Sequence, residues 1–387
     1  MLKKAEMNQN NRIPLFERYP LLGEKLPWVS LGNWPSPVQK LENIGRSLEY
    51  ENIWIKRDDK SSDEYGGNKV RKLEFVLADA IKNKNNTIVT YGGLGTNHGL
   101  ATTIYARQLG IRTILVLHNQ PVTDHVQENL LLDSLYGARL VYATNKLDVL
   151  LKTVGYQITN KNLYFLPLGG SSPTGGLGFV NAAFELKQQV LSGQVPEPAY
   201  IFCPLGTAGT LAGLTLGCRL AEMKTRVIGV RVTEIGLSNE EKVSKLANRI
   251  GALLCKYDKS LPLFHFKPTD IEIMHNFFGK GYGFSTPDGL EAMELIRRTE
   301  NIELEVTYTA KTFAAVVNFI RQYLSDNVPI LYWHTYNGVD FTSQIKVNHD
   351  YTKLPRSFHW CFEKNLIPYL NHEETKLTGE ALQNERV

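Results

Sequence analysis

The sequence predicts an α/β protein built on open, twisted sheets of parallel strands. Short β-rich runs that end in glycine or polar residues alternate with helical patterns along most of the 387 residues. The strand runs are continuously apolar, which indicates strands buried on both faces, as in parallel sheets. The hydrophobic share of 43% can fill a sizeable core, and the length suggests about two domains.

The elements are expected in a regular order along the chain. The predicted strands are residues 87–91, 112–117, 139–143, 162–166, 199–203, 226–232 and 329–333. Helices are expected near residues 100–109 and 126–135. Residues 1–30 are expected to be irregular, and residues 365–387 to form a loosely held polar tail. Ligands of such sheets bind in the loops that follow the strands, so those loops are where chemistry is expected.

Composition and charge exclude several classes of protein. Lysine and arginine total 43 against 39 acidic residues, and this net charge of +4 is too small and too evenly spread for a nucleic-acid or membrane surface. No apolar run approaches the ~20 residues of a membrane-spanning helix, and the start, MLKKAEMNQNNR, lacks the apolar stretch of a signal peptide. The four cysteines fit neither a disulfide framework nor a zinc site, so we expect a cytoplasmic setting and no metal.

The first loop that could carry chemistry is Gly66-Gly67-Asn68-Lys69, which precedes a helical pattern. The two glycines let the backbone approach a ligand closely, and Asn68 is a good helix cap. Lys69 then lies at the helix start, where the positive end of the helix dipole disfavours an ammonium group. A lysine with a pKa lowered in this way can act as a nucleophile or form a Schiff base. The alternative is a solvated basic helix start.

A second loop, with the letters GGLGTNHG from Gly92 to Gly99, lies between a predicted strand and a predicted helix. Backbone N–H groups at a helix N-terminus bind anions, either phosphate or carboxylate. A dinucleotide site is not indicated, because the third glycine of its fingerprint is missing and no acidic residue follows the next strand. Taken alone, His98 is more typical of an ordinary loop histidine.

A third loop, residues 205–213, directly follows the strand that ends at Cys203. Its small residues and the hydroxyls of Thr207 and Thr210 at a helix start are typical of a phosphate cradle. The lysine of a P-loop is absent, so hydrolysis of a nucleoside triphosphate is not expected. The alternative is a glycine loop that only lets a helix pack closely on a strand.

Two tyrosines and a histidine complete the candidates. Tyr282 lies in Gly-Tyr-Gly, Tyr308 lies in Thr-Tyr-Thr, and each alone is typical of half-buried packing. His334 opens the run HTYNG after the last predicted strand. A lysine that can form an imine, an anion pocket for a carboxylate and another for a phosphate are together what pyridoxal phosphate and an amino acid require.

These loops resemble those of the D-cysteine desulfhydrase and 1-aminocyclopropane-1-carboxylate deaminase family. Its members are pyridoxal-phosphate enzymes of the tryptophan-synthase-β-like fold, also called fold type II. The matching runs are IKRDDKSS, YGGNKVRKLEF, YGGLGTNHG, LPLGGSSPTGGLGFVNAAFEL, CPLGTAGTLAGL, GYGFSTPDGLEAMELIRRTENIELEVTYTAKT and YWHTYNG. They follow the order of the family and spread over about three quarters of the chain.

The resemblance implies pyridoxal 5'-phosphate as the cofactor and a small amino acid as the substrate. It implies two open twisted α/β domains with the cofactor in the cleft between them. The large cofactor-binding domain is expected from residues 1–72 and 181–387, and a small inserted domain from residues 73–180. Members of the family are usually homodimers, so a homodimer is expected.

The resemblance also implies roles for residues of the first two loops. Lys69 is expected to be the Schiff-base lysine, which also moves the α-proton of the substrate. Lys72 is expected to contact the phosphate. Thr96, Asn97 and His98 are expected to hold the substrate carboxylate, with Asn97 also near the phenolic oxygen of the cofactor and Thr96 in a catalytic role.

Further roles are implied for the later loops. The phosphate loop is expected to consist of Thr207, Ala208, Gly209 and Thr210. Tyr282 and Tyr308 match the two catalytic tyrosines of the family, and Thr309 matches the residue that faces the pyridine nitrogen.

Thr309, together with His98, is similar to the desulfhydrase branch, because the deaminases of the family resemble one another in having glutamate at the position of Thr309. A carboxylate keeps the ring nitrogen protonated, whereas a hydroxyl only hydrogen-bonds it and leaves a weaker electron sink. We therefore expect β-elimination from D-cysteine or a similar amino acid, giving pyruvate, ammonia and sulfide. The alternatives are a 1-aminocyclopropane-1-carboxylate deaminase, another lyase with a reshaped pocket, or a non-catalytic protein that binds the cofactor.

The chain departs from the family pattern at four places. Thr96 stands where serine is usual, Gly95 replaces a glutamine or similar residue, and Gly99-Leu100 replaces the frequent Thr-Arg. The usual His-Thr-Gly-Gly is His334-Thr335-Tyr336-Asn337. Two bulky residues beside the cofactor are expected to change the substrate size that the site accepts.

Overall fold

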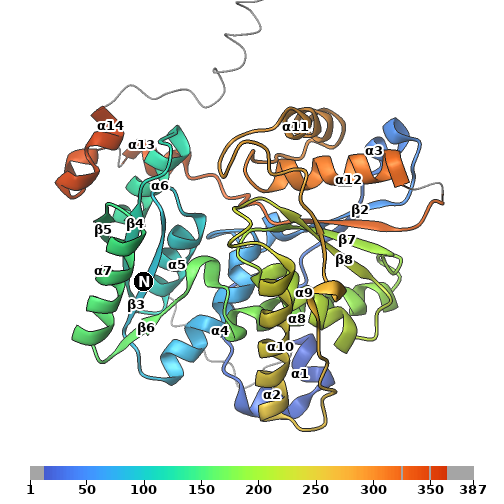
Figure 1. Cartoon of the computed structure of the whole chain (residues 1–387), viewed down its shortest axis with the longest axis horizontal. Coiled ribbons are helices and arrows are strands. Elements are labelled where there is room, and N and C mark those ends of the chain that lie inside the picture. Colours follow the sequence, from blue (N-terminus) through green and yellow to red (C-terminus); the bar gives the residue numbers. More distant parts are fainter. Residues whose placement is uncertain (1–12, 324–325, 348–349, 364–387) are drawn as a thin grey trace, which may run out of the picture.

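The computed structural model describes residues 13–323, 326–347 and 350–363, so the tail predicted at 365–387 lies outside the described residues. The chain forms two sheets that lie side by side, each with helices packed against it (Figure 1). Within the described ranges, no helix is long and apolar enough to cross a membrane.

The larger sheet has six strands in the order β1-β2-β10-β7-β8-β9. Its members are β1 (Val38–Lys40), β2 (Ile53–Arg57), β7 (Tyr200–Leu205), β8 (Arg226–Arg231), β9 (Glu272–Met274) and β10 (Ile330–His334). All neighbouring pairs are parallel except β1 and β2. The central strand β10 is buried at every position, as a strand covered on both faces must be.

The smaller sheet has four strands in the order β5-β4-β3-β6, and all its pairs are parallel. Its members are β3 (Thr87–Gly93), β4 (Arg112–His118), β5 (Arg139–Ala143) and β6 (Leu163–Phe165). These strands fall inside residues 73–180, the range predicted for an inserted domain. The domain boundaries themselves stay a prediction.

Helices surround the two sheets. The longer ones are α4 (Asn68–Lys82), α5 (Asn97–Gln108), α6 (Asp124–Leu135), α7 (Lys146–Thr159), α8 (Pro173–Leu191), α9 (Gly209–Leu220), α10 (Glu240–Tyr257), α11 (Pro287–Glu300) and α12 (Thr309–Tyr323). The shorter ones are α1 (Pro14–Arg18), α2 (Pro20–Lys25), α3 (Glu42–Leu48), α13 (Thr342–Val347), α14 (Trp360–Glu363) and the 3-10 turn η2 (Leu168–Gly170).

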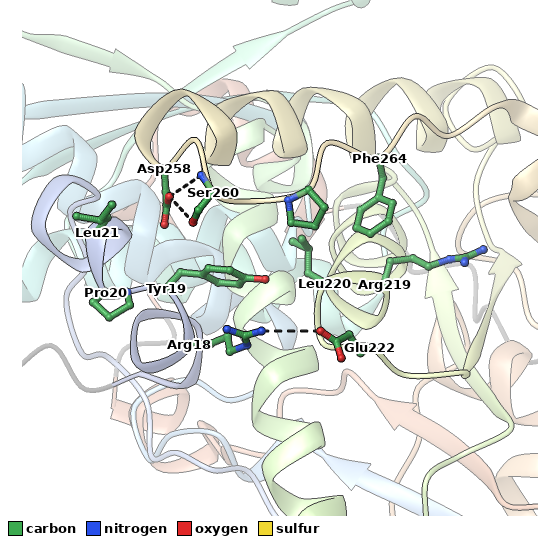
Figure 2. Close-up of a pocket in the computed structure, with 11 residues that line it drawn as sticks. Arg18, Tyr19, Pro20, Leu21, Arg219, Leu220, Glu222, Asp258, Ser260 and Phe264 are labelled. Atoms are coloured by element: carbon green, nitrogen blue, oxygen red, sulfur yellow. Dashed lines mark hydrogen bonds and ion pairs between the residues drawn. The ribbon is translucent and has the colours of Figure 1, made fainter.

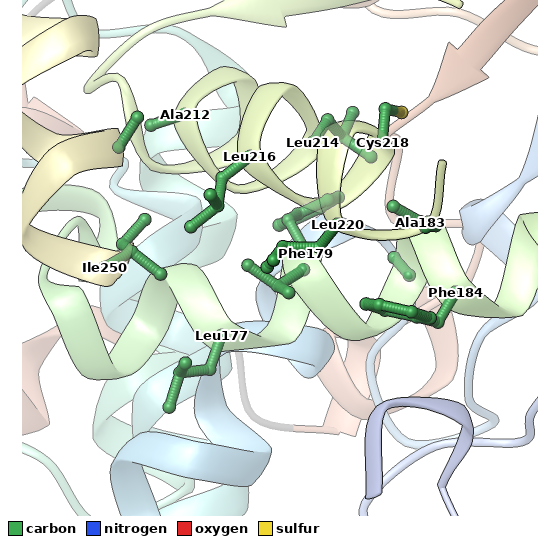
Figure 3. Close-up of a cluster of buried hydrophobic side chains, with 14 of the residues drawn as sticks. Leu177, Phe179, Ala183, Phe184, Ala212, Leu214, Leu216, Cys218, Leu220 and Ile250 are labelled. Carbon is green, nitrogen blue, oxygen red and sulfur yellow. The ribbon is translucent and has the colours of Figure 1, made fainter. Parts of the chain in front are cut away.

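Helices α8, α9 and α10 form the core on one face of the larger sheet (Figure 3). Phe179, Leu214 and Leu216 are fully or almost fully buried there. The helices approach so closely that a Cβ atom at Gly213 would lie 2.5 Å from Cβ of Phe179. This packing fixes the start of α9, which follows the predicted phosphate loop.

A buried network of charges ties α4 to α8 and to the larger sheet. The guanidinium of Arg71 donates to Asp58 at 2.8 Å and to Glu185 at 2.9 Å, and Nζ of Lys56 lies 2.5 Å from Glu185. The two cations hold the pKa of Glu185 down to about 2, against the effect of burial. Because Arg71 is two residues from Lys69, the network helps to fix the start of α4.

The predicted α/β class and the parallel strands are confirmed, and all seven predicted strands are present within a few residues. Strands β1, β2 and β9 were not predicted, since they are short or lack flanking helical patterns. The prediction of an irregular segment at 1–30 is wrong for residues 14–25, where α1 and α2 form. Each begins with a proline, which is well suited to the first turn of a helix.

Candidate functional site

The amine of Lys69 lies at the start of α4, where the sequence analysis places it. Its Nζ donates to Oδ1 of Asn68 at 3.1 Å. Burial lowers the pKa of Lys69 to about 8, and the nearby carboxylate of Glu305 partly opposes this shift. Burial is therefore the main cause, whereas the sequence had suggested the helix dipole. A large share of this amine is neutral near pH 8, as a nucleophile requires.

The phosphate loop and η2 form a compact cradle beside Lys72. The hydroxyl of Ser171 lies 2.7 Å from that of Thr207 and accepts the backbone N–H of Gly209 at 3.1 Å. A Cβ atom at Gly209 would lie 2.6 Å from the Ser171 hydroxyl and 2.9 Å from Nζ of Lys72. A side chain at position 209 would displace Ser171 or Lys72, and polar groups converge at the N-terminus of α9.

The ammonium of Lys72 is buried and short of partners. It donates to the carbonyl of Gly169 at 3.1 Å, and within the described ranges no carboxylate lies within ion-pair distance of it. Burial, and then the neighbouring charge of Lys69, hold its pKa well below the usual value. A buried amine of this kind stays protonated only beside a compensating anion.

The two glycine loops meet at the helix starts that they precede. Nδ2 of Asn68 donates to the hydroxyl of Thr210 at 3.3 Å, so the start of α4 lies against the start of α9. Ala208 caps α9 in the left-handed conformation, with φ of 69°. A residue with a side chain in this region indicates a backbone held in place by its surroundings.

Thr96 caps α5, since its hydroxyl accepts the backbone N–H of Gly99 at 3.2 Å. A Cβ atom at position 99 would lie 2.5 Å from the methyl group of Thr96. Threonine at position 96 and glycine at position 99, both departures from the family pattern, are therefore structurally coupled. The extra methyl of Thr96 occupies space that a side chain at position 99 would need.

His98 points into the protein. Its Nε2 lies 3.2 Å from the hydroxyl of Thr90, and its Nδ1 is buried without a partner within the described residues. A Cβ atom at Gly170 would lie 3.3 Å from its ring. Burial, followed by the charges of Lys69 and Lys72, keeps its pKa well below 6.5, so the ring is neutral.

Asn97 is held by α6. Its Oδ1 accepts from Nδ2 of Asn129 at 3.2 Å and lies 3.0 Å from Nε2 of His125. The same Nδ2 of Asn129 also donates to the carbonyl of Gly95 at 3.0 Å. Two residues that the sequence analysis missed therefore fix the orientation of the predicted substrate loop.

Tyr282 and Tyr308 form a pair. Their hydroxyl oxygens are 2.5 Å apart, and their rings meet edge to face. Burial, followed by the neighbouring Tyr282, raises the pKa of Tyr308 well above 10. A Cβ atom at Gly206 would lie 3.4 Å from the Tyr308 ring, so the pair adjoins the phosphate loop.

Glu305 organises the turn that carries Tyr308 and Thr309. Its carboxylate accepts the backbone N–H groups of Thr307, Tyr308 and Thr309 at 2.7–2.8 Å. The hydroxyl of Thr309 accepts the N–H of Glu305 at 2.7 Å and donates back to its carbonyl at 3.1 Å. Both the hydroxyl predicted to face the ring nitrogen and the nearby carboxylate are thus engaged in capping α12.

Lys311 connects α12 to the segment that leads to Tyr282. Its Nζ is buried and donates to the carbonyls of Phe278 at 2.7 Å and Gly281 at 3.3 Å. No role was expected for Lys311 from the sequence, although it lies three residues after Tyr308.

The segment after β10 is hydrogen-bonded to the first glycine loop and packs closely against it. Oδ1 of Asn337 accepts the N–H of Gly66 at 2.8 Å, and a Cβ atom at Gly67 would lie 2.6 Å from the carbonyl oxygen of Tyr336. The half-buried ring of Tyr336 stacks on His334 with centroids 5.8 Å apart. Asn337 thus supplies an anchoring contact that glycine could not.

A surface pocket of about 600 Å³ lies elsewhere, between α1, α2, the end of α9 and the loop after α10 (Figure 2). Arg18, Tyr19 and Asp258 are among its lining residues, and none of the predicted site residues lines it. Within the described parts of the chain, no three histidine, cysteine or acidic side chains gather as metal ligands do.

A family model described as "Pyridoxal-phosphate dependent enzyme" matches residues 29–335. The chain belongs to the pyridoxal-phosphate dependent enzymes. The resemblance to the D-cysteine desulfhydrase and 1-aminocyclopropane-1-carboxylate deaminase family, the fold and the cofactor inferred from the sequence are thereby confirmed.

Named relatives agree with this family. A Pyrococcus furiosus protein named "Putative 1-aminocyclopropane-1-carboxylate deaminase" is 33% identical over 77% of this chain and 88% of its own length. A D-cysteine desulfhydrase of Salmonella schwarzengrund is 32% identical over 80% and 94%. A solved structure of an ACC deaminase homologue is 27% identical, with a TM-score of 0.70 over 85% of this chain and 98% of that one.

The residues present fit pyridoxal phosphate. The buried amine of Lys72, which a neighbouring anion would hold protonated, and the cradle at Gly209 suit a phosphate anion. The amine of Lys69, with its pKa lowered to about 8, suits an aldehyde.

The supporting residues missed by the sequence analysis are Ser171, Asn129, His125, Glu305 and Lys311. A weak signal existed for Ser171, Glu305 and Lys311, which lie in runs matched to the family. Glu305 lies four residues before Thr309, but its role depends on how the turn folds.

Proposed function

We propose that the enzyme is a lyase that removes the β-substituent of a small amino acid, with D-cysteine as the preferred substrate. D-cysteine and one water would give pyruvate, ammonia and hydrogen sulfide. The bound cofactor would supply the electron sink that makes the α-proton of the substrate removable. The D-cysteine desulfhydrase named among the relatives supports this substrate class.

The residues of this chain would divide the remaining work. Lys69 would hold the cofactor and accept the α-proton at Nζ, because its lowered pKa leaves a large share of the amine neutral near pH 8. Lys72, the loop from Thr207 to Thr210 and Ser171 would hold the phosphate. Asn97, with the hydroxyl of Thr96, would bind the substrate carboxylate.

The tyrosine pair is suited to proton transfer at the leaving group. The 2.5 Å contact between the two hydroxyls means that one donates to the other. The raised pKa of Tyr308 keeps its hydroxyl protonated at neutral pH. We propose that the pair supplies a proton to the departing sulfur.

The environment of Thr309 is the observation that carries the choice of desulfhydrase over deaminase. The carboxylate nearby, Glu305, accepts three backbone N–H groups, which hold it to the turn before α12. A hydroxyl at position 309 then leaves a weaker electron sink. This suffices when a good leaving group departs from the β-carbon.

The experiment is to incubate the purified enzyme with D-cysteine and to measure sulfide and pyruvate separately. L-cysteine and 1-aminocyclopropane-1-carboxylate serve as competing substrates in the same assay. We expect sulfide and pyruvate in equal amounts from D-cysteine, and loss of both products with Lys69→Ala. Keto acid from 1-aminocyclopropane-1-carboxylate alone would support the deaminase function instead.

We also propose a cytoplasmic homodimer, as the family resemblance implies. All four cysteines are free thiols, and Cys203, Cys218 and Cys361 are buried, which supports a reducing compartment. Mass measurement in solution and fractionation of cells test these two points.

A further inference from the structure

The first tyrosine of the pair, Tyr308, is fixed through its backbone. It directly precedes α12, its N–H donates to the carboxylate of Glu305 at 2.7 Å, and its carbonyl accepts the hydroxyl of Thr312 at 2.7 Å. The helix itself packs on strands β7, β8 and β10 of the larger sheet (Figure 1). The position of Tyr308 is therefore set by the core of the larger sheet.

The second tyrosine, Tyr282, lies in a tight turn with glycine on both sides of it. The N–H of Phe284 donates to the carbonyl of Gly281 at 3.4 Å, so Tyr282 is the second residue of this turn. Gly283, the third residue, has φ of 84°, the left-handed conformation that a type II turn requires there. Because glycine restricts the backbone least, the turn by itself does not fix where the hydroxyl of Tyr282 points.

Lys311 ties the base of this turn to α12. It is the third residue of the helix, and its side chain is fully buried. Its Nζ donates to the carbonyl of Gly281 at 3.3 Å and to the carbonyl of Phe278 at 2.7 Å. The carbonyl of Gly281 is the same one that closes the turn. A single amine thus holds the entry to the segment and the first residue of the turn.

The start of the segment is also held from β8. The guanidinium of Arg231 lies 4.5 Å from the ring centroid of Phe278, and Nζ of Lys311 lies 5.5 Å from the same centroid. Both cations are within the range in which an aromatic ring attracts a positive charge. Arg231 also donates to the carbonyl of His275 at 3.2 Å. With the chain anchored before the turn, the contact of Lys311 with Gly281 sets where the turn lies.

We propose that Lys311 is a positioning residue for the elimination step, because it holds the turn of Tyr282 so that the hydroxyls of Tyr282 and Tyr308 meet. This inference rests on the proposed role of the pair, which is to supply a proton to the departing sulfur. Tyr308 and Lys311 are three residues apart, within one helical turn, so both contacts join the same two segments. A purely structural lysine would instead affect the enzyme in the same way whether or not Tyr282 carries a hydroxyl.

The test begins with the anchoring of the turn, which needs no turnover. Lys311→Met keeps a similar shape without the amine, and Lys311→Gln is the second variant, measured in the same way if Lys311→Met does not fold. Arg321→Met is the matched control, since it removes a cation that is 54% exposed from the same helix. The cofactor-loaded enzymes are treated with trypsin, and cleavage after the exposed Lys280 is followed by mass spectrometry. We expect faster cleavage in the Lys311 variants and no change in the control.

The second measurement is the steady-state release of sulfide from D-cysteine. We expect kcat of Lys311→Met to fall by about 10- to 100-fold with little change in KM, since a misplacement of ~1 Å can cost about 100-fold in rate. Removal of the α-proton would depend on Lys69 and not on the tyrosine pair. D-cysteine recovered from the variant in deuterated water should therefore still carry deuterium at Cα.

A double-mutant cycle decides whether Lys311 acts through Tyr282. In the Tyr282→Phe enzyme, Lys311→Met should lower kcat little further, because the hydroxyl that it positions is already absent. Effects that multiply in the double variant would overturn the proposal, as would wild-type cleavage after Lys280 in Lys311→Met. A wild-type enzyme that releases no sulfide from D-cysteine would contradict the proposed function instead, and the cleavage rate would then decide the anchoring of the turn by itself.

Discussion

Replacement of Lys72 by methionine is expected to maintain or raise the stability of the cofactor-free enzyme but to lower its affinity for the cofactor. A lysine with a purely structural role would not give these two opposite results. In the cofactor-free enzyme the Lys72 ammonium is buried, has the Gly169 carbonyl 3.1 Å away, and is repelled by Lys69. Its pKa is lowered by folding, so the unfolded chain binds this proton more tightly. Stability of the cofactor-free enzyme therefore rises with pH between the folded-state pKa and the usual value of 10.5.

Two opposite results follow for Lys72→Met. The cofactor-free variant is expected to be at least as stable as wild type, with the largest advantage at low pH and a smaller one as the pH rises. Cofactor affinity is expected to fall by about 10- to 150-fold, since a hydrogen bond to a charged group contributes about 1.5–3 kcal/mol.

The assay is thermal unfolding of the cofactor-free enzyme at several pH values, together with titration of pyridoxal phosphate followed by absorbance. Lys82→Met, at the exposed end of the same helix, is the control and should change neither quantity much. A Lys72→Met variant that is less stable at low pH and keeps its cofactor affinity would refute the assignment of Lys72 to the phosphate.

Three other predictions follow from the geometry. Glu185→Gln should lower the free energy of unfolding by about 3–5 kcal/mol, measured by chemical denaturation. The reason is that the buried charge of Arg71 would keep one carboxylate partner fewer. A loss below ~1 kcal/mol would show that the network is dispensable. Gly99→Ala should lower the free energy of unfolding by about 1–3 kcal/mol, because the new methyl group overpacks against the methyl group of Thr96. Adding Thr96→Ser to this variant should recover most of the lost stability. Simple additivity of the two stability changes would contradict this coupling. The cofactor-free enzyme should take up pyridoxal phosphate faster as the pH rises, with a midpoint near 8, the pKa of Lys69. The reason is that only the neutral amine attacks the aldehyde. A midpoint above 10 would indicate an ordinary, solvated lysine.

Local patterns were enough to predict the class, the parallel strands and the loops that carry Lys69, Thr96 and Thr207. Each of these loops directly follows a strand or opens a helix, so its position is set by nearby sequence. The combination of an imine-forming lysine with two anion pockets indicated the cofactor, and the family resemblance implied the same one.

Contacts between segments that are far apart along the chain could not be predicted from the sequence. Asn129 reaches Asn97 from another helix, and Ser171 reaches Thr207 across 36 positions, so neither pairing has a local signal. The engagement of Thr309 by Glu305 depends on the backbone turn before α12, which residue spacing alone does not define.

The most direct test of the central claim is to locate the covalent attachment of the cofactor. The yellow enzyme is reduced with borohydride, digested, and analysed by mass spectrometry for the peptide that carries the added pyridoxyl group. We predict a single modified residue, Lys69. A modification at Lys72 or at another lysine, or a colourless protein with no modified peptide, would contradict the account.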